Sequence, residues 1–212
     1  MSHIRQFTVV LVLAVAGWMG CAHESRVVAD ANPANVADTK AAMRELWAGH
    51  IFWIRNVVLD NVTGNPEARD IADKEVVANA KQIASTISPF YGEAASDKLF
   101  TLLADHHAAI KGYSDATVFG DKPQEDAALA ELASNADDIA LFLSEANPYL
   151  PKDTVRGLIA AHGAHHVAQI IQLQQHDYRG EAQTWRVMQQ HVDVIADALT
   201  TALAKQFPAR FS

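Results

Sequence analysis

Two series of histidine and asparagine residues recur along the chain at a spacing that could assemble a binding site. One series is His50, His106 and His162, the other is Asn79, Asn135 and His191, and each step in both series is 56 residues. Neutral imidazole nitrogens bind zinc, copper and iron, so several of them in one place would form a transition-metal site. These residues therefore predict metal or small-ligand binding.

His166 extends this candidate site. It follows His162 by four residues, and two residues at that spacing lie on the same face of a helix. The expected metal ligands are His50, His106, His162, His166 and His191, with Asn79 and Asn135 beside them in one polar layer. Zinc, copper and iron are the candidate metals. His107 lies about 100° around the helix from His106, and we expect it at the surface, as we do His176 in its turn.

The elements that would position these residues are helices. Each 56-residue interval is long enough for two helices of about 22 residues with short turns, and apolar residues recur at spacings of three and four. Glycine and proline fall between the apolar segments, as in Gly64-Asn65-Pro66. We predict six helices, over residues 36–62, 67–88, 93–117, 123–145, 152–177 and 181–206. The predicted fold class is all-α, an up-and-down bundle of about six helices built from three 56-residue helical hairpin repeats.

The six polar residues are predicted to lie at one level of this bundle. Two residues of an antiparallel hairpin are at the same height when the turn lies midway between them, and His50 and Asn79 are centred on Gly64 and Asn65. The other pairs are centred on their turns in the same way. Buried imidazole and amide groups cost on the order of 1–3 kcal/mol for each missing hydrogen-bond partner. The layer is therefore a hydrogen-bonded network that sets helix register, a metal or ligand site, or a chance periodicity.

The first 20 residues have the layout of a secretory signal peptide. A polar start with Arg5 precedes an apolar run from Phe7 to Trp18, which is shorter than the roughly 20 residues of a membrane-spanning helix. Residues 18–21 resemble the bacterial lipobox, in which a cysteine after a small residue is lipidated; Trp18 stands where that pattern prefers leucine. Cys21 is the only cysteine, so it cannot form an internal disulfide. We expect Cys21 to be lipidated, with palmitate among its acyl chains; a plain signal peptide is the alternative.

This interpretation divides the chain into a signal peptide at 1–20, a lipidated cysteine with a tether at 21–35, and a helical bundle at 36–212. Without its first 20 residues the chain carries 16 basic and 25 acidic residues, a formal charge of about −9. Nucleic-acid binding needs clustered Lys and Arg, so no nucleic-acid partner is expected. We expect a cell-envelope protein that is lipid-anchored to a bacterial membrane and faces the periplasm or the exterior.

Three segments carry a resemblance to other proteins: 46–55 (LWAGHIFWIR), 89–95 (PFYGEAA) and 135–143 (NADDIALFL). In these segments the chain resembles a family of small, uncharacterised bacterial exported helical-bundle proteins. The resemblance implies the fold and assigns no role to any residue. The histidines are also similar in part to those of hemerythrin-like di-iron proteins. Ile110 and Ala196, however, stand where that family has carboxylate ligands, which disfavours di-iron chemistry.

Two functions are consistent with these features. The first is a membrane-anchored envelope lipoprotein whose helical bundle binds a transition metal or small ligand at the His/Asn layer. The second is a structural or protein-interaction module whose layer only fixes helix register. An enzyme ranks third, because the sequence has neither a Gly-x-x-x-x-Gly-Lys-Ser/Thr phosphate-binding loop nor a Gly-x-Ser-x-Gly nucleophile motif.

Overall fold

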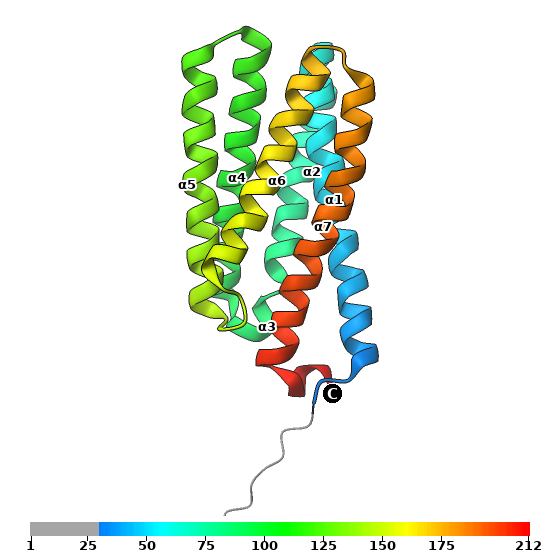
Figure 1. The fold of residues 1–212 in the computed structure, drawn as a ribbon, viewed down its shortest axis with the longest axis vertical. Coiled ribbons are helices and arrows are strands. Elements are labelled where there is room, and N and C mark those ends of the chain that lie inside the picture. The colour runs from blue at the N-terminus through cyan, green and yellow to red at the C-terminus, as the bar shows by residue number, and fades with distance from the viewer. Residues whose placement is uncertain (1–29) are drawn as a thin grey trace, which may run out of the picture.

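The computed structural model describes residues 30–212, and within that range the chain is an all-α bundle without strands (Figure 1). The predicted all-α bundle class is confirmed. The helices are α1 (Pro33–Thr63), α2 (Pro66–Ser85), the single turn α3 (Ser88–Tyr91), α4 (Glu93–Phe119), α5 (Lys122–Ala146), α6 (Lys152–Gln174), α7 (Tyr178–Gln206) and the 3-10 turn η1 (Pro208–Phe211). The predicted signal peptide, Cys21 and most of the predicted tether lie outside the described residues.

The six long helices form three antiparallel hairpins, α1–α2, α4–α5 and α6–α7. The first helices of the hairpins, α1, α4 and α6, contact one another and form the inside of the bundle. Each second helix bridges two of these inner helices: α2 packs on α1 and α4, α5 on α4 and α6, and α7 on α6 and α1. Residues that point inward from α1, α4 and α6 can therefore meet on the bundle axis.

The three hairpin turns have the same construction. A residue with positive φ ends each first helix, and the residue after it caps the second helix with its side chain. The positive-φ residues are Gly64, Gly120 and His176, and the capping residues are Asn65, Asp121 and Asp177. Left-handed backbone satisfies the last carbonyls of a helix, and Asn or Asp caps stabilise the next helix by about 1 kcal/mol. Both sets occur at 56-residue intervals.

The first helix begins earlier than the sequence suggested. The tether was predicted to extend to residue 35, but α1 starts at Pro33, because Asn32 accepts a hydrogen bond from the Ala34 amide and proline suits the first helical position. The Asn32 amide also donates to the Phe211 carbonyl (2.9 Å). This bond ties the start of the described chain to its C-terminal end, at the same end of the bundle as α3 (Figure 1).

The boundary after α2 also differs from the prediction. The second helix was expected to continue to residue 88, but it ends at Ser85, and the chain forms the separate turn α3 before α4. Thr86 ends the helix by donating its hydroxyl to the Ile83 carbonyl (2.6 Å). Proline at 89 is then accommodated in the first turn of α3, where it needs no amide hydrogen.

The apolar core is interrupted by a polar level. Ile54, Val57 and Ile110 belong to the apolar cluster on the side of the hairpin turns. Met43, Ile83 and Leu99 belong to a second cluster, nearer the chain ends. The histidines predicted for the polar layer lie between these clusters. Within residues 30–212 no helix combines the length and the apolar character needed to cross a membrane.

Candidate metal centre

Three of the predicted ligands converge inside the bundle. His50 from α1 and His162 and His166 from α6 have ligand nitrogens that all lie within 4.8 Å of one another. Each of the three side chains is only about 1 % exposed. Within the described part of the chain, this trio is the group of His, Cys, Asp or Glu residues whose spacing suits a metal ion.

The two histidines of α6 already have the separation of metal ligands. The Nε2 atoms of His162 and His166 are 3.2 Å apart. Two nitrogens that each lie about 2.0–2.1 Å from a tetrahedral zinc ion are about 3.3 Å apart. Without a metal, one of these nitrogens must carry a proton and donate it to the other. With a metal, both lone pairs can bind the same ion.

His50 supplies the nitrogens with unmet bonding capacity. Neither its Nδ1 nor its Nε2 has a hydrogen-bond partner among residues 30–212. Leaving such a group buried costs on the order of 1–3 kcal/mol, so buried histidines normally have partners. The pKa of His50 is lowered to about 3, first by burial and then by the neighbouring His106 and His107. Its imidazole is therefore neutral at physiological pH, which is the form that binds metals.

The other two members of the trio are neutral for the same reason. Burial lowers the pKa of His162 and of His166 well below the usual value, and the surrounding imidazoles lower both further. The rings of His50 and His162 have centroids 5.7 Å apart, and those of His162 and His166 4.6 Å. Protons therefore compete weakly with a metal ion for these ligands.

His106 lies beside the trio with a defined orientation. Asn135 donates its side-chain amide to the Leu102 carbonyl (2.9 Å), so its Oδ1 accepts from His106 Nδ1 (2.9 Å). This bond leaves the lone pair of His106 on Nε2, an atom that is buried and has no partner within residues 30–212. Partners of this kind orient metal-binding histidines. The ring of His106 stacks on that of His162 with centroids 5.6 Å apart, which makes His106 a flanking ligand candidate.

The same cross-helix hydrogen bond occurs in all three hairpins. Asn79 donates to the Leu46 carbonyl (3.0 Å), and His191 Nε2 donates to the Leu158 carbonyl (2.9 Å), in the positions that Asn135 and Leu102 occupy in the second hairpin. Asn79 differs from Asn135, because its buried Oδ1 lacks a partner among the described residues. An amide–imidazole bond thus joins Asn135 to His106, and no such bond joins Asn79 to His50.

His191 is at the edge of the layer rather than within the trio. It is half-buried, its Nε2 is engaged with Leu158, and its ring centroid lies 6.3 Å from that of His162. His165, also half-buried, packs against it at 5.2 Å. The predicted ligands therefore divide into a central trio and two flanking residues, His106 and His191.

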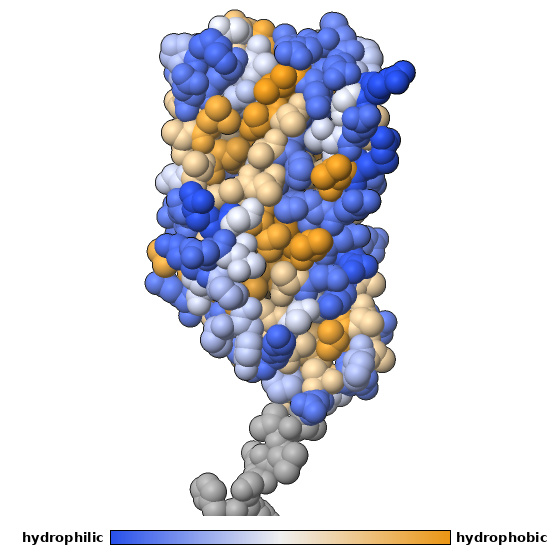
Figure 2. All heavy atoms as spheres, viewed as in Figure 1, coloured by the Kyte–Doolittle hydropathy of each residue, from blue (hydrophilic) through white to orange (hydrophobic). Residues whose placement is uncertain are grey.

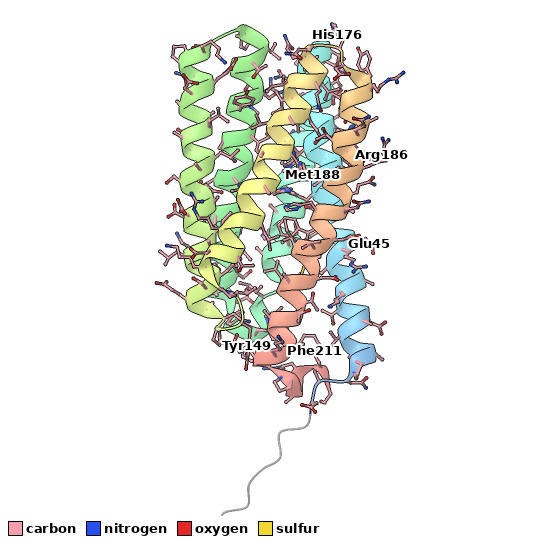
Figure 3. The ribbon with its side chains drawn as sticks, in the orientation of Figure 1. Glu45, Tyr149, His176, Arg186, Met188 and Phe211 are labelled. Carbon is pink, nitrogen blue, oxygen red and sulfur yellow. The ribbon has the colours of Figure 1, made fainter. Side chains whose placement is uncertain are left out.

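The prediction that His107 lies at the surface is wrong. Its side chain is 5 % exposed, and its Nε2 contacts Asp73 Oδ1 from α2 at 2.6 Å. The reason is that α4 is an inner helix, so the position 100° from His106 faces α2 instead of solvent. Residues 73 and 107 are centred on residue 90, in α3, so the midpoint argument that aligned the layer would also have paired these two. His176, in contrast, is exposed at the turn between α6 and α7, away from the C-terminus (Figure 3).

Trp47 closes one side of the histidine cluster. Its indole meets the rings of His50 and His162 edge-on, with centroids 5.7 and 5.8 Å away. The side chain is 3 % exposed and belongs to the apolar cluster nearer the chain ends. The indole thus lies between the histidines and the rest of that apolar cluster.

Comparison with known proteins adds no assignment. No protein-family model, no curated protein and no solved structure matches the chain.

Proposed function

We propose that this protein binds one transition-metal ion in the interior of its helical bundle, with His50, His162 and His166 as the central ligands. The observation that carries the proposal is the convergence of three fully buried imidazoles within 4.8 Å. His50 adds two buried nitrogens that have no partner in the described part of the chain. A metal ion would bind the lone pair of one of these two nitrogens.

The donor set favours copper and zinc over magnesium and calcium. The trio consists of imidazoles, which suit Zn, Cu and Fe, whereas Mg and Ca prefer oxygen ligands. The affinity of nitrogen sites for divalent ions is lower for Fe²⁺ than for Zn²⁺ and is highest for Cu²⁺. His106, which flanks the trio and whose Nε2 has no partner within residues 30–212, is the candidate for a fourth ligand. We expect Cu²⁺ to bind more tightly than Zn²⁺, and Fe²⁺ to be the weakest of the three.

Metal content and metal-dependent melting test this proposal. The chain, purified without a histidine tag and freed of metal, should take up about one Cu²⁺ or Zn²⁺ per molecule by elemental analysis. At a free metal concentration 100-fold above Kd, the binding contributes about 2.7 kcal/mol, or a rise in Tm of about 5–10 °C for a bundle of this size. Since ligands must be deprotonated, the experiment is run at pH 7.

Two variants separate the metal effect from stability. His50→Ala removes one ligand and should abolish the metal-induced rise in Tm, even though the metal-free variant is itself less stable. His165→Ala, on the same helix as His162 and His166 but outside the trio, should retain the rise. If metal-stripped wild type melts at the same temperature with and without Cu²⁺, Zn²⁺ and Fe²⁺, the proposal is wrong.

A second candidate function is a structural or protein-interaction module in which the polar layer sets helix register. The observation in its favour is the recurrent bond from Asn79, Asn135 and His191 to carbonyls of the inner helices. Buried polar residues do fix register in some helical assemblies. Within residues 30–212, however, the His50 nitrogens and the Asn79 Oδ1 have no hydrogen-bond partner, and this favours the metal site.

We further infer that the bundle is displayed on a bacterial envelope membrane by a lipid on Cys21. The support is the sequence of the first 21 residues, with its short apolar run and a single cysteine. The lipid anchor would connect the membrane to the end of the bundle where Asn32 meets Phe211.

A further inference from the structure

An apolar cavity of about 50 Å³ lies in the half of the bundle between the histidine cluster and the chain ends. All six long helices contribute to its wall. Representative lining residues are Trp47, Ile83, Leu103, Phe142, Ile159 and Leu199. We propose that this cavity binds a small apolar molecule of the size of xenon or dioxygen. This site is separate from the proposed metal centre and does not depend on it.

The cavity offers little to hold water. Thr86 uses its hydroxyl on the Ile83 carbonyl, and the Tyr91 hydroxyl is bonded to Gln206 (2.6 Å) and Asn147 (2.9 Å). These are polar lining side chains whose bonds are already made. A buried water needs two to four polar partners, and cavities without them stay empty of water and take up apolar guests.

Trp47 provides one hydrogen-bond donor in the cavity lining that has no acceptor among the described residues. Its Nε1 is buried and has no partner within residues 30–212. A single N–H cannot satisfy a water molecule, which requires several partners. The indole therefore leaves the cavity suited to an apolar guest, and it places that guest one ring away from His50 and His162.

The size of the cavity limits the guest. An apolar cavity of about 150 Å³ accepts benzene or xenon. The volume here, about 50 Å³, is roughly one third of that value and leaves room for a monatomic or diatomic molecule only. An acyl chain or an aromatic ring would need the core to rearrange, which close-packed interiors resist.

A groove on the outside of the bundle gives a route to the cavity. The groove lies between α6 and α7, has a volume of about 430 Å³, and shares Leu150, Val155, Leu158 and Ala198 with the cavity wall. Figure 2 shows apolar side chains gathered along the face of the molecule where α6 and α7 lie in front. A small guest would need only side-chain motions of this shared wall to pass inward.

Xenon is the probe for this site, measured by the ¹²⁹Xe chemical shift in solutions of the full bundle. Wild type should produce a saturable shift that depends on protein concentration. Ala198→Leu places three more carbons at the shared wall and should reduce the shift to the level of nonspecific contacts. Ala133→Leu, at an exposed position of α5, is the matched control and should bind xenon as wild type does.

A second variant changes the cavity in the opposite direction. Leu103→Ala enlarges it and should strengthen xenon binding several-fold, and this test remains valid if Ala198→Leu folds poorly. The proposal is overturned if wild type gives the same nonspecific shift as Ala198→Leu, or if Leu103→Ala leaves the shift unchanged. Metal content is measured on the same samples. Loss of xenon binding with normal metal uptake refutes the cavity site alone, and the reverse result refutes the metal centre alone.

Discussion

The histidines at the centre of the bundle are held in their neutral form by burial. Burial is the main cause of the lowered pKa of His50, to about 3, and of His106, to about 4. For His106 the bond to Asn135 opposes part of the shift. The Asn135 bond also selects the tautomer, so a neighbouring residue controls both the charge and the direction of this imidazole. Neutral, oriented imidazoles can bind a metal directly, whereas protonating them would bury a positive charge at a cost in free energy.

This burial predicts a steep loss of stability in acid for the metal-free protein. In the unfolded chain a histidine has a pKa of about 6.5, above the folded values, so the unfolded state binds more protons as the pH falls. The stability that the neutral histidines give the folded state is fully present above about pH 6.5. It decreases as the pH falls toward the folded pKa values of His50, about 3, and of His106, about 4. Each such histidine should lower the free energy of unfolding by about 1.4 kcal/mol per pH unit between pH 6 and 4. Urea denaturation at pH 7, 6 and 5 measures this slope.

A single substitution identifies the contribution of one histidine. His50→Leu removes a titrating group while filling much of the same space. As the pH falls, the free energy of unfolding of the variant should therefore decrease less steeply than that of wild type, and the two slopes should differ by about 1.4 kcal/mol per pH unit. An identical slope in the two proteins would contradict the assignment of His50 as a buried, neutral group.

Inner and outer helices contribute different residues to the site. The inner helices α1, α4 and α6 carry His50, His106, His162 and His166. The outer helices α2, α5 and α7 carry Asn79, Asn135 and His191, which bond to carbonyls of the inner helices. Each of these carbonyls belongs to the leucine four residues before His50, His106 or His162. The bond therefore fixes the height of an outer helix against the histidine of its own hairpin.

The turn between α6 and α7 predicts a stabilising substitution. His176 has φ of 60°, in the left-handed region where the other two hairpin turns have Gly64 and Gly120. A side chain costs about 1 kcal/mol in this region, and glycine avoids that cost at some expense in unfolded-state entropy. We expect His176→Gly to raise the free energy of unfolding by about 0.5–1 kcal/mol, measured by urea denaturation.

The matched reverse change is Gly120→Ala. A Cβ at Gly120 would meet no described atom within 4 Å, so the substitution tests backbone strain without a steric clash. It should destabilise the bundle by about 1 kcal/mol. A destabilising His176→Gly would mean that the contact between His176 Nδ1 and the Tyr178 hydroxyl (3.1 Å) outweighs the backbone strain.

The whole molecule has two distinct ends. The three hairpin turns are at one end, and the start of α1, the turn α3 and the C-terminal turn η1 are at the other (Figure 1). Asn35 strengthens the second end by donating its side-chain amide to the Phe211 carbonyl (3.2 Å). A lipid on Cys21 would approach this end through residues 22–32. The hairpin turns would then be the part farthest from the membrane.

The anchor is tested on the full-length precursor expressed in bacteria. Cys21→Ser should abolish incorporation of labelled palmitate, and the protein should stay as unprocessed precursor or be released from membranes, because acylation requires the thiol. The control is His176→Gly, which changes the bundle but leaves the N-terminal segment intact and should be labelled normally. Membrane association and maturation of Cys21→Ser equal to those of wild type would refute lipid anchoring.

The helical content and the positions of the turns were accessible from the sequence, because both depend on local chemistry. Apolar spacing of three and four residues defines helices, and glycine or proline with a capping Asn or Asp defines their ends. The errors in the helix boundaries were also local. The cap at Asn32 started α1 earlier than predicted, and the side-chain bond of Thr86 ended α2 earlier. The common level of His50, Asn79 and their counterparts was predicted from midpoints, since antiparallel hairpins relate height to sequence distance.

The sequence by itself determined which residues share a level, whereas only the tertiary structure decided which of them meet. Level depends on the rise along each helix, but meeting depends on how each helix is rotated and which neighbours it has. That rotation brought His166 into the trio with His50 and His162, kept His191 at the edge, and buried His107 against Asp73. It also created the apolar cavity behind Trp47, which forms where side chains from six helices fail to fill the space between them.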